Sequence, residues 1–254
     1  MVMGRRILRR RSGSAVIYIP VAALLMVLLG IYGISAFLRI IEIEVVGVSM
    51  YTIDDIIAAS GISTGDNMLF VNTDSVIKKI EAALPYVSEA SIEFDIPDRV
   101  RINISETTAM ATIKDSGGVL VIDAAGRILE IAEVAPEYLV EIVGFTPYNS
   151  IVGSAVRAHS GDETRLDYLK EVLEVIKSEG IVDEVSVVDM TSIAYISFQY
   201  KNRFTVVLGT TDNIRYKFNS LAVIVEEITA DRPLSVNGYI YLSDRGPARF
   251  EPER

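Results

Sequence analysis

The chain has 254 residues, with 34 Asp and Glu against 24 Lys and Arg, a net charge of −10 and no cysteine. The lack of cysteine excludes disulfides, thiolate metal sites and a cysteine nucleophile. Five arginines lie within the first 11 residues, so the rest of the chain carries 19 basic against 34 acidic residues. This acidic remainder offers no basic stripe to neutralise phosphates, which excludes nucleic-acid binding.

The first predicted element is an uncharged run of 27 residues, Ser12–Leu38. It exceeds the ~20 apolar residues that a helix needs to cross a bilayer. A basic cluster comes directly before it: Arg5, Arg6, Arg9, Arg10 and Arg11. By the positive-inside rule the N-terminus is cytoplasmic and the rest extracytoplasmic. A cleavable secretory signal is the alternative, but its apolar part would span only ~7–15 residues. We therefore predict a cytoplasmic tail over 1–13 and a single transmembrane helix over 14–38.

The next segment has the pattern of a strand, two helices and two strands. Apolar residues alternate with glutamates over Ile41–Val45, as in a strand with one buried face. Thr52 begins a capping box for a short helix, and a second amphipathic helix runs from about Asp74 to Pro85. Two alternating stretches follow, joined by a turn at 95–98. This predicts a β-α-α-β-β unit in which two helices cover one face of a three-stranded sheet.

The remainder has a mixed α/β pattern with mainly antiparallel connections. Strands are expected at Met110–Lys114, Val119–Ile122, Ile128–Ile131, Leu139–Val143, Val185–Asp189, Ile193–Tyr200, Phe204–Leu208 and Gly238–Leu242. Helices are expected at Thr164–Ser178 and Asn213–Thr229, where apolar residues share one face. The predicted fold class is therefore α+β, with a β-α-α-β-β unit followed by a mixed α/β domain.

Several short motifs occur in a fixed order in the first of these units. They include Gly47, Asn67 and Phe70, Pro85 and Val87, Pro97, and Glu106. In this order, after a basic-flanked anchor, they resemble the POTRA domain of the FtsQ/DivIB family of bacterial cell-division proteins. Leu120–Ile128 resembles the opening of that family's second, β-rich domain, and the last residues look more like the Gram-positive versions.

The resemblance implies a POTRA domain over 39–107, a β domain over 108–246 and a C-terminal tail over 247–254. The family usually carries a basic residue and a proline after the last POTRA strand, whereas this chain reads Thr107-Thr108. Without that proline, we expect a looser junction between the domains.

No constellation of residues favours catalysis, and we predict no catalytic residue, cofactor, metal site or small-molecule substrate. His159 stands beside Ser160, but adjacent side chains rarely meet, so a solvated loop histidine is the preferred interpretation. Carboxylates on the predicted strands are interpreted as the solvated side of a sheet: Glu42, Glu44, Glu89 and Glu93. The sequence leaves open whether a glycosidase-like pair of carboxylates exists elsewhere in the predicted extracytoplasmic part of the chain.

Partner binding is the remaining class of function, and the resemblance implies where it occurs. FtsQ/DivIB proteins bind the membrane proteins FtsB (DivIC) and FtsL through the end of the β domain and regulate septal peptidoglycan synthesis. We predict that the last strand is a free edge that accepts a partner strand, and that POTRA helices offer a second surface. The candidate residues are Tyr239, Ile240, Tyr241, Ser243, Arg245, Gly246 and Phe250. Whether both tyrosines face a partner or pack on the last helix stays open.

The predicted function is therefore a non-enzymatic scaffold of the division septum, located in the cell membrane. Its candidate partners are FtsB/DivIC-like and FtsL-like membrane proteins, the septal peptidoglycan synthase and the lipid bilayer. Two rival classes are an anchored cell-wall hydrolase and a POTRA-containing transport component. The second would need a following membrane barrel, and no series of ~10-residue lipid-facing strands is present.

Overall fold

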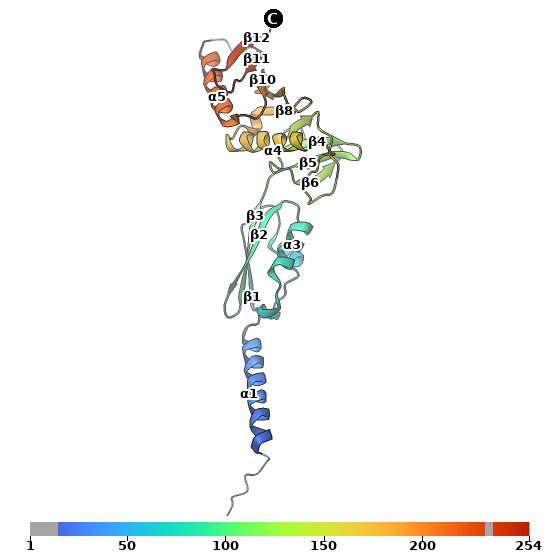
Figure 1. The fold of residues 1–254 in the computed structure, drawn as a ribbon, viewed down its shortest axis with the longest axis vertical. Coiled ribbons are helices and arrows are strands. Elements are labelled where there is room, and N and C mark those ends of the chain that lie inside the picture. The colour runs from blue at the N-terminus through green and yellow to red at the C-terminus, as the bar shows by residue number, and fades with distance from the viewer. Residues whose placement is uncertain (1–14, 232–235, 254) are drawn as a thin grey trace, which may run out of the picture.

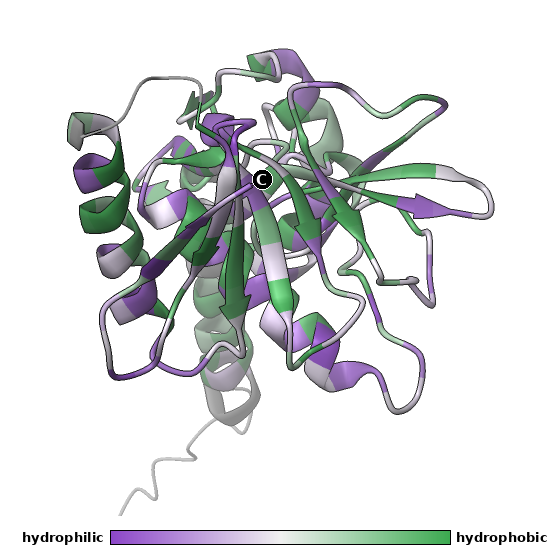
Figure 2. Ribbon diagram, turned by 90° about the horizontal axis from the view of Figure 1, so that it is seen from above, coloured by the Kyte–Doolittle hydropathy of each residue, from purple (hydrophilic) through white to green (hydrophobic). Residues whose placement is uncertain are grey.

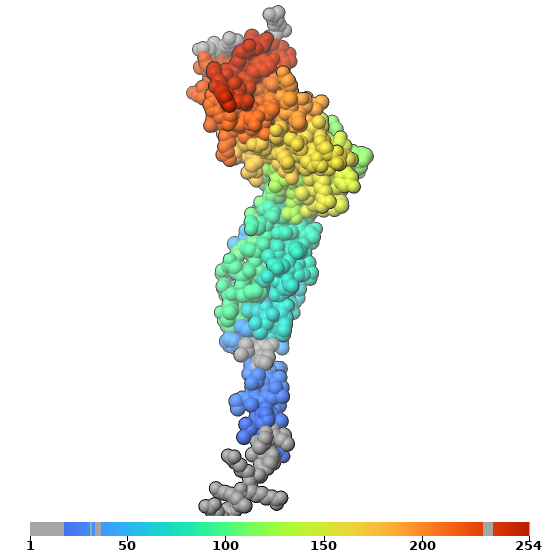
Figure 3. Space-filling view, in the orientation of Figure 1, coloured from blue at the N-terminus to red at the C-terminus, as the bar shows by residue number. Residues whose placement is uncertain are grey.

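The computed structural model describes residues 15–231 and 236–253. These residues form a helix, a small first domain and a larger second domain, arranged in series along one axis (Figure 1). Figure 3 shows the two domains as bodies that meet end to end. The predicted cytoplasmic tail with its five arginines lies outside the described residues.

The predicted span corresponds to helix α1, Ala15–Phe37, which contains Pro20. Its described side chains include many exposed apolar ones, among them Leu24, Leu25, Met26, Leu28 and Leu29. Within residues 15–231 and 236–253, no helix meets the length and hydropathy required of a membrane span.

The first domain has the predicted β-α-α-β-β order. Its elements are β1 (Glu42–Val46), α2 (Ile53–Ser60), the short 3-10 helix η1 (Met68–Phe70), α3 (Thr73–Ala83), β2 (Val87–Asp95) and β3 (Arg99–Glu106). The sheet order is β1-β3-β2, with β1 parallel and β2 antiparallel to β3. Ile56 of α2 and Ile80 of α3 share a buried core with Val100 and Ile102 of β3. The helices therefore cover one face of the sheet, as predicted.

Local signals fix the ends of α2. The hydroxyl of Thr52 accepts a hydrogen bond from the amide of Asp55, and the carboxylate of Asp55 accepts one from the amide of Thr52. This reciprocal pair satisfies two amides that a helix start otherwise leaves without partners. Gly61 ends the helix in the left-handed region, with φ of 67°.

The face of this sheet away from the helices carries ion pairs. The parallel register places Glu42 beside Arg99 and Glu44 beside Arg101, with N···O distances of 2.8 and 3.1 Å. Arg101 also meets Asp95 of the neighbouring strand at 3.1 Å. Of the glutamates predicted to be solvated, Glu42 and Glu44 thus lie on the outer face in ion pairs, and such exposed pairs contribute little each.

The second domain is built on a single mixed sheet. Its elements are β4 (Ala111–Asp115), β5 (Gly118–Ile122), β6 (Ile128–Ala132), β7 (Val140–Val143), α4 (Glu163–Ser178), η2 (Val182–Glu184), β8 (Val185–Asp189), β9 (Ile196–Tyr200), β10 (Phe204–Gly209), α5 (Ile214–Asp231), β11 (Gly238–Tyr241) and β12 (Arg249–Pro252). The nine strands lie in the order β12-β11-β10-β9-β8-β7-β4-β5-β6. Hydrophobic residues follow these strands, and many loops at the rim are hydrophilic (Figure 2). Buried residues of α4 and α5 join the strands in one core.

The sheet contains one strand that the sequence pattern did not predict. The terminal residues 247–254 were expected to be a tail, whereas Arg249–Pro252 form β12 and pair antiparallel with β11. The expected strand at Ile193–Tyr200 is also shorter, because residues before Ile196 form a turn.

An arginine of the second domain joins the two domains. The guanidinium of Arg127 donates through Nη1 to the carbonyl oxygen of Val87 at 2.9 Å and through Nη2 to that of Glu81 at 2.7 Å. These carbonyls lie at the start of β2 and near the end of α3. The expectation of a loose junction, based on Thr107-Thr108, therefore overlooked a direct contact between the domains.

Replacing Arg127 with methionine should loosen this junction. We expect a loss of about 1.5–3 kcal/mol of coupling between the domains, because two charge-assisted hydrogen bonds disappear. The absence of native cysteine allows spin labels on cysteines placed at exposed Lys78 and Glu174, and the distance distribution between them should broaden. An unchanged distribution would mean that Arg127 does not fix the junction.

The last residue of β3, Glu106, binds the loop that follows β1. Its carboxylate accepts hydrogen bonds from the amides of Ser49 and Met50 at 2.9 Å each, from the amide of Tyr51 at 3.3 Å, and from the hydroxyl of Ser49. Burial acts to raise the pKa of Glu106, but these hydrogen bonds outweigh it and hold the pKa below its ordinary value. This explains why a glutamate occupies the end of the strand.

We expect the Glu106→Gln variant to lose about 1–2 kcal/mol of stability at neutral pH. The lowered pKa stabilises the folded state fully above the unfolded value of about 4.3, and this contribution is lost as the pH falls through the folded value. The difference in unfolding free energy between wild type and variant should therefore shrink in acid. Urea denaturation at several pH values measures it, with Glu89→Gln on the exposed face of β2 as the matched control. A difference in unfolding free energy that does not change with pH would contradict the stabilising role assigned to the ionised Glu106 carboxylate.

Candidate partner-binding surface

One end of the large sheet presents the candidate surface. The prediction placed the free edge at Gly238–Leu242, but β11 is flanked on both sides, by β10 in parallel and by β12 in antiparallel register. Among the described strands, β12 stands at the end of the sheet order. The edge that a partner strand could extend is therefore β12.

The core side of β12 is fixed by its one aromatic residue. Phe250 stands opposite Ile240 in the register, and its ring meets that of Phe204 edge to face with centroids 6.0 Å apart. Ile240 is fully buried in the core that includes residues of α5. The predicted candidates Ile240 and Phe250 thus hold the edge in place instead of facing a partner.

The opposite side of the same two strands carries the predicted tyrosines. Tyr239 and Tyr241 are 40% and 36% exposed, and their rings stack at 6.4 Å with an interplanar angle of 24°. The guanidinium of Arg249 lies 5.4 Å from the ring centroid of Tyr241. These side chains form an outward aromatic and cationic patch next to the edge, which is the composition enriched at interface hot spots. The alternative in which both tyrosines pack on the last helix is excluded by this orientation.

The loop between β11 and β12 contains the other predicted residues. Ser243 and Arg245 are exposed, and the amide of Arg245 donates to the hydroxyl of Ser243 at 3.5 Å. The carbonyl of Gly246 accepts from the hydroxyl of Tyr216 on α5 at 3.4 Å. The structure therefore brings all seven predicted residues to one end of the domain, with only part of them on the outer face.

A lysine that the sequence analysis overlooked positions this loop. Lys217 of α5 is 1% exposed, and its ammonium lies 2.6 Å from the carboxylate of Asp244 and 2.8 Å from the carbonyl of Thr210. A buried cation is stable only when it is paired and hydrogen-bonded. Lys217 thus ties the β11–β12 loop and the β10–α5 turn to the helix beneath them.

A shallow groove continues the surface along α5. It is lined by Tyr216, Asn219, Ser220, Val223, Ile224, Glu227, Pro247 and Ala248. Val223 and Tyr216 expose large apolar area here, and Pro247 and Ala248 lead directly into β12. The groove and the terminal strand are therefore two parts of one surface, suited to a partner that pairs with the strand and packs an apolar segment on the helix.

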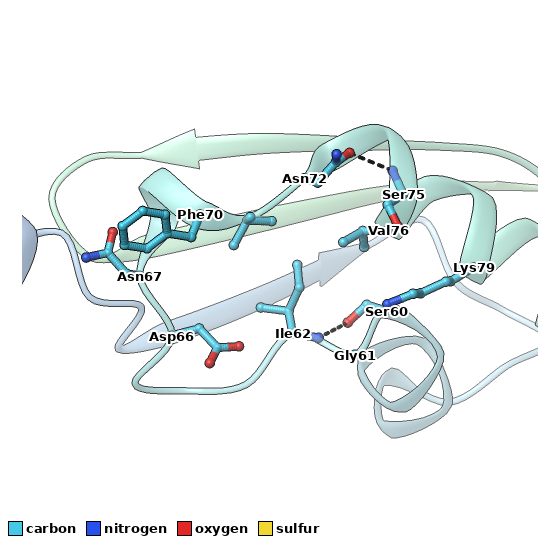
Figure 4. A pocket seen from close by; sticks show the side chains of 11 residues that line it. Ser60, Gly61, Ile62, Asp66, Asn67, Phe70, Asn72, Ser75, Val76 and Lys79 are labelled. Carbon is cyan, nitrogen blue, oxygen red and sulfur yellow. Dashed lines mark hydrogen bonds between the residues drawn. The ribbon is translucent and has the colours of Figure 1, made fainter.

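The first domain has a second hollow between α2 and α3 (Figure 4). Asn72 caps α3 by accepting from the amide of Ser75 at 3.0 Å, and the hydroxyl of Ser60 accepts from the amide of Ile62 at 3.0 Å. The side chain of Lys79 also lines the hollow. These polar groups mostly serve local structure, so the hollow is a weaker candidate than the sheet end.

The predicted motif residues of the first domain have structural roles. Asn67 caps η1 by accepting from the amide of Leu69 at 2.9 Å. Val87 is buried at the start of β2, Pro85 lies in the turn before it, and Pro97 lies in the turn between β2 and β3. Phe70 is the exception, since its side chain is exposed.

The single histidine of the chain is the residue that the sequence analysis weighed as a general base. His159 is exposed, and its ring lies edge to face with that of Tyr148, with centroids 5.3 Å apart. Over the described ranges, no group of three or more acidic or histidine residues could hold a metal ion.

The geometry defines a class: a β-α-α-β-β POTRA domain joined to a β-rich domain with an open sheet end. Residues 38–107 match the family model described as "POTRA domain, FtsQ-type". The chain is 27% identical over 212 residues to the cell division protein DivIB of Clostridium acetobutylicum, covering 83% of this chain and 81% of that protein. It is 22% identical over 194 residues to the cell division protein FtsQ of Streptomyces griseus, covering 76% and 89%. The chain thus contains a POTRA domain of the FtsQ type and is similar over most of its length to the cell division proteins DivIB and FtsQ.

Proposed function

We propose that this protein is a non-enzymatic scaffold of the division septum that captures a partner at the end of its second domain. The observation that carries the proposal is the terminal strand β12 beside the outward patch of Tyr239, Tyr241 and Arg249. A strand edge supplies backbone hydrogen bonds, and the aromatic patch supplies contact area at low entropic cost. The similarity to cell division proteins supports a partner from the division machinery.

We further propose that the partner is an FtsB/DivIC-like membrane protein, accompanied by an FtsL-like one, and that the assembly regulates the septal peptidoglycan synthase. In this proposal the binding surface lies outside the cytoplasm, as the positive-inside rule places the residues after α1. The serial arrangement of α1, first domain and second domain carries the β12 end far from α1 (Figure 1), so an inserted α1 would hold this surface away from the membrane.

Membrane anchoring through α1 is part of the proposal. The uncharged sequence over 12–38 and the basic residues before it support a helix inserted with its N-terminus in the cytoplasm. The exposed apolar side chains of α1 support the same assignment, since they contact no part of the first domain's core.

A fluorescent protein fused to the N-terminus of the full chain tests the function. In dividing cells of the source organism we expect a band at mid-cell that appears as the septum forms. An even outline around the cell throughout division would contradict the proposal and indicate a general envelope protein. Release of fragments from peptidoglycan by the purified full chain would instead favour the anchored hydrolase.

A further inference from the structure

Large apolar side chains gather at the end of the first domain that faces α1. They come from three places: the segment after α1, the helix η1 and the turn between β2 and β3. Each is between 60% and 82% exposed: Ile41, Leu69, Phe70 and Ile96, together with Phe37 at the end of α1. We call the first four the membrane-facing rim.

Backbone hydrogen bonds hold the three parts of the rim together at the same end of the domain. The amide of Met68 donates to the carbonyl of Leu38 at 3.0 Å, that of Ile40 to Asp66 at 2.8 Å, and that of Ile41 to Asp98 at 2.7 Å. The four residues after α1 are thus tied both to η1 and to the β2–β3 turn. Figure 4 shows Phe70 and Asn67 at the end of the domain where this turn and the chain from α1 meet.

The side chains of the rim are not core residues that have been left uncovered. The immediate neighbours of its residues already fill the core: Ile40 and Met68 are buried, whereas Ile41 and Leu69 next to them point outward. Clustered exposed apolar side chains of this size mark a contact surface. What covers the rim must therefore come from outside the first domain.

We propose that the membrane-facing rim lies in the interfacial layer of the lipid bilayer and holds the first domain against the membrane surface. This rests on the proposed insertion of α1. Only residues 38–41 separate α1 from β1, and their hydrogen bonds leave no free linker, so an inserted α1 carries the rim to the bilayer surface. Exposed apolar side chains then occur on both sides of this short connection, at Phe37 on α1 and at Ile41 in the rim.

The charges at this end are compatible with a lipid surface. Arg39 is exposed beside the end of α1, the depth at which basic side chains meet headgroup phosphates. The carboxylate of Asp95 is paired with Arg101 at 3.1 Å, and that of Asp66 accepts from the amide of Ser63 at 2.8 Å. The carboxylates of Asp95 and Asp66 are thus engaged within the domain.

The experiment uses the full chain in phosphatidylcholine vesicles that contain doxyl-labelled lipids. Because the protein has no cysteine, single cysteines at Leu69, Ile96, Leu28 and Tyr138 can each carry an environment-sensitive fluorophore. Interfacial groups lie about 5–10 Å into the headgroup and acyl boundary. We expect the probes at Leu69 and Ile96 to be quenched more strongly by a shallow doxyl group than by a deep one. The probe at Tyr138, exposed in the second domain, should not be quenched.

The probe at Leu28 separates the two possible failures. Quenching of Leu28 by the deep doxyl group without quenching of Leu69 and Ile96 would overturn the rim proposal and leave the anchor intact. The rim would then face water or another protein. Absence of quenching at Leu28 would overturn the anchor and, with it, the rim. A blue-shifted, quenched emission at both rim positions supports the proposal.

Discussion

Replacing Gly47 with alanine is expected to destabilise the first domain by about 3 kcal/mol or more. Gly47 has a φ of 90°, and a Cβ added there would lie 2.0 Å from the carbonyl oxygen of Ile104 on β3. The obstacle is backbone in the central strand of the sheet, so the strand pairing itself would have to shift. The loss should appear in urea denaturation of the full chain in detergent and as faster hydrogen exchange in β1 and β3.

Gly65 provides the matched control for this substitution. Its φ is 97°, but a Cβ there would meet nothing within 4 Å. Gly65→Ala should therefore cost only the conformational strain, about 1–2 kcal/mol. Equal losses of stability in the two variants would show that the clash with the carbonyl of Ile104 is not the reason why alanine destabilises the domain at residue 47.

Replacing Asp244 with alanine should have the largest effect at the candidate surface. The ammonium of Lys217 would stay buried with only the carbonyl of Thr210 as its partner. We expect a loss of about 2–4 kcal/mol, slightly below that of a wholly buried pair because Asp244 is half exposed. Thermal denaturation measures it, and the loop between β11 and β12 should lose protection from hydrogen exchange.

Two further variants make this prediction specific. Adding Lys217→Met to Asp244→Ala should recover most of the stability, because removing both charges removes the desolvation cost. Glu141→Ala breaks the exposed pair with Lys114 and should cost under about 1 kcal/mol. If the double variant were as unstable as Asp244→Ala alone, the buried charge would not be the cause.

The first domain could be predicted from the sequence because its signals are local. Strict alternation over 41–45, the capping box at Thr52 and the turn at 95–98 each determine a few neighbouring residues, and the structure contains β1, α2 and the β2–β3 hairpin where expected. The order of the elements then follows from covering one sheet face with two helices.

The end of the second domain could be predicted only in part. Residues 249–252 read Arg-Phe-Glu-Pro, which is too short to show alternation, and β12 exists because Phe250 packs against Phe204. The free edge was therefore assigned to the wrong strand. Proline at position 240 would disrupt the core rather than an edge, because Ile240 is fully buried.

The structural roles of Lys217 and Arg127 could not be predicted from sequence patterns. A lysine within an amphipathic helix normally faces solvent, so nothing marked Lys217 as the buried partner of Asp244, 27 positions further on. Arg127 likewise acts on backbone carbonyls in another domain, and a carbonyl leaves no sequence signal. Both interactions join residues that are far apart in the sequence, so they become visible only in the folded structure.

Site-specific photocrosslinking in dividing cells tests the central claim most directly. A photoreactive residue would replace Tyr241, Glu251 or Val223 of the full chain, with exposed Tyr195 and Tyr138 as controls. Capture at the β12 end predicts adducts with the FtsB/DivIC-like protein at the first three positions and none at the controls. Adducts confined to the controls, or their absence at Tyr241 and Glu251 while the fusion still forms a mid-cell band, would contradict it.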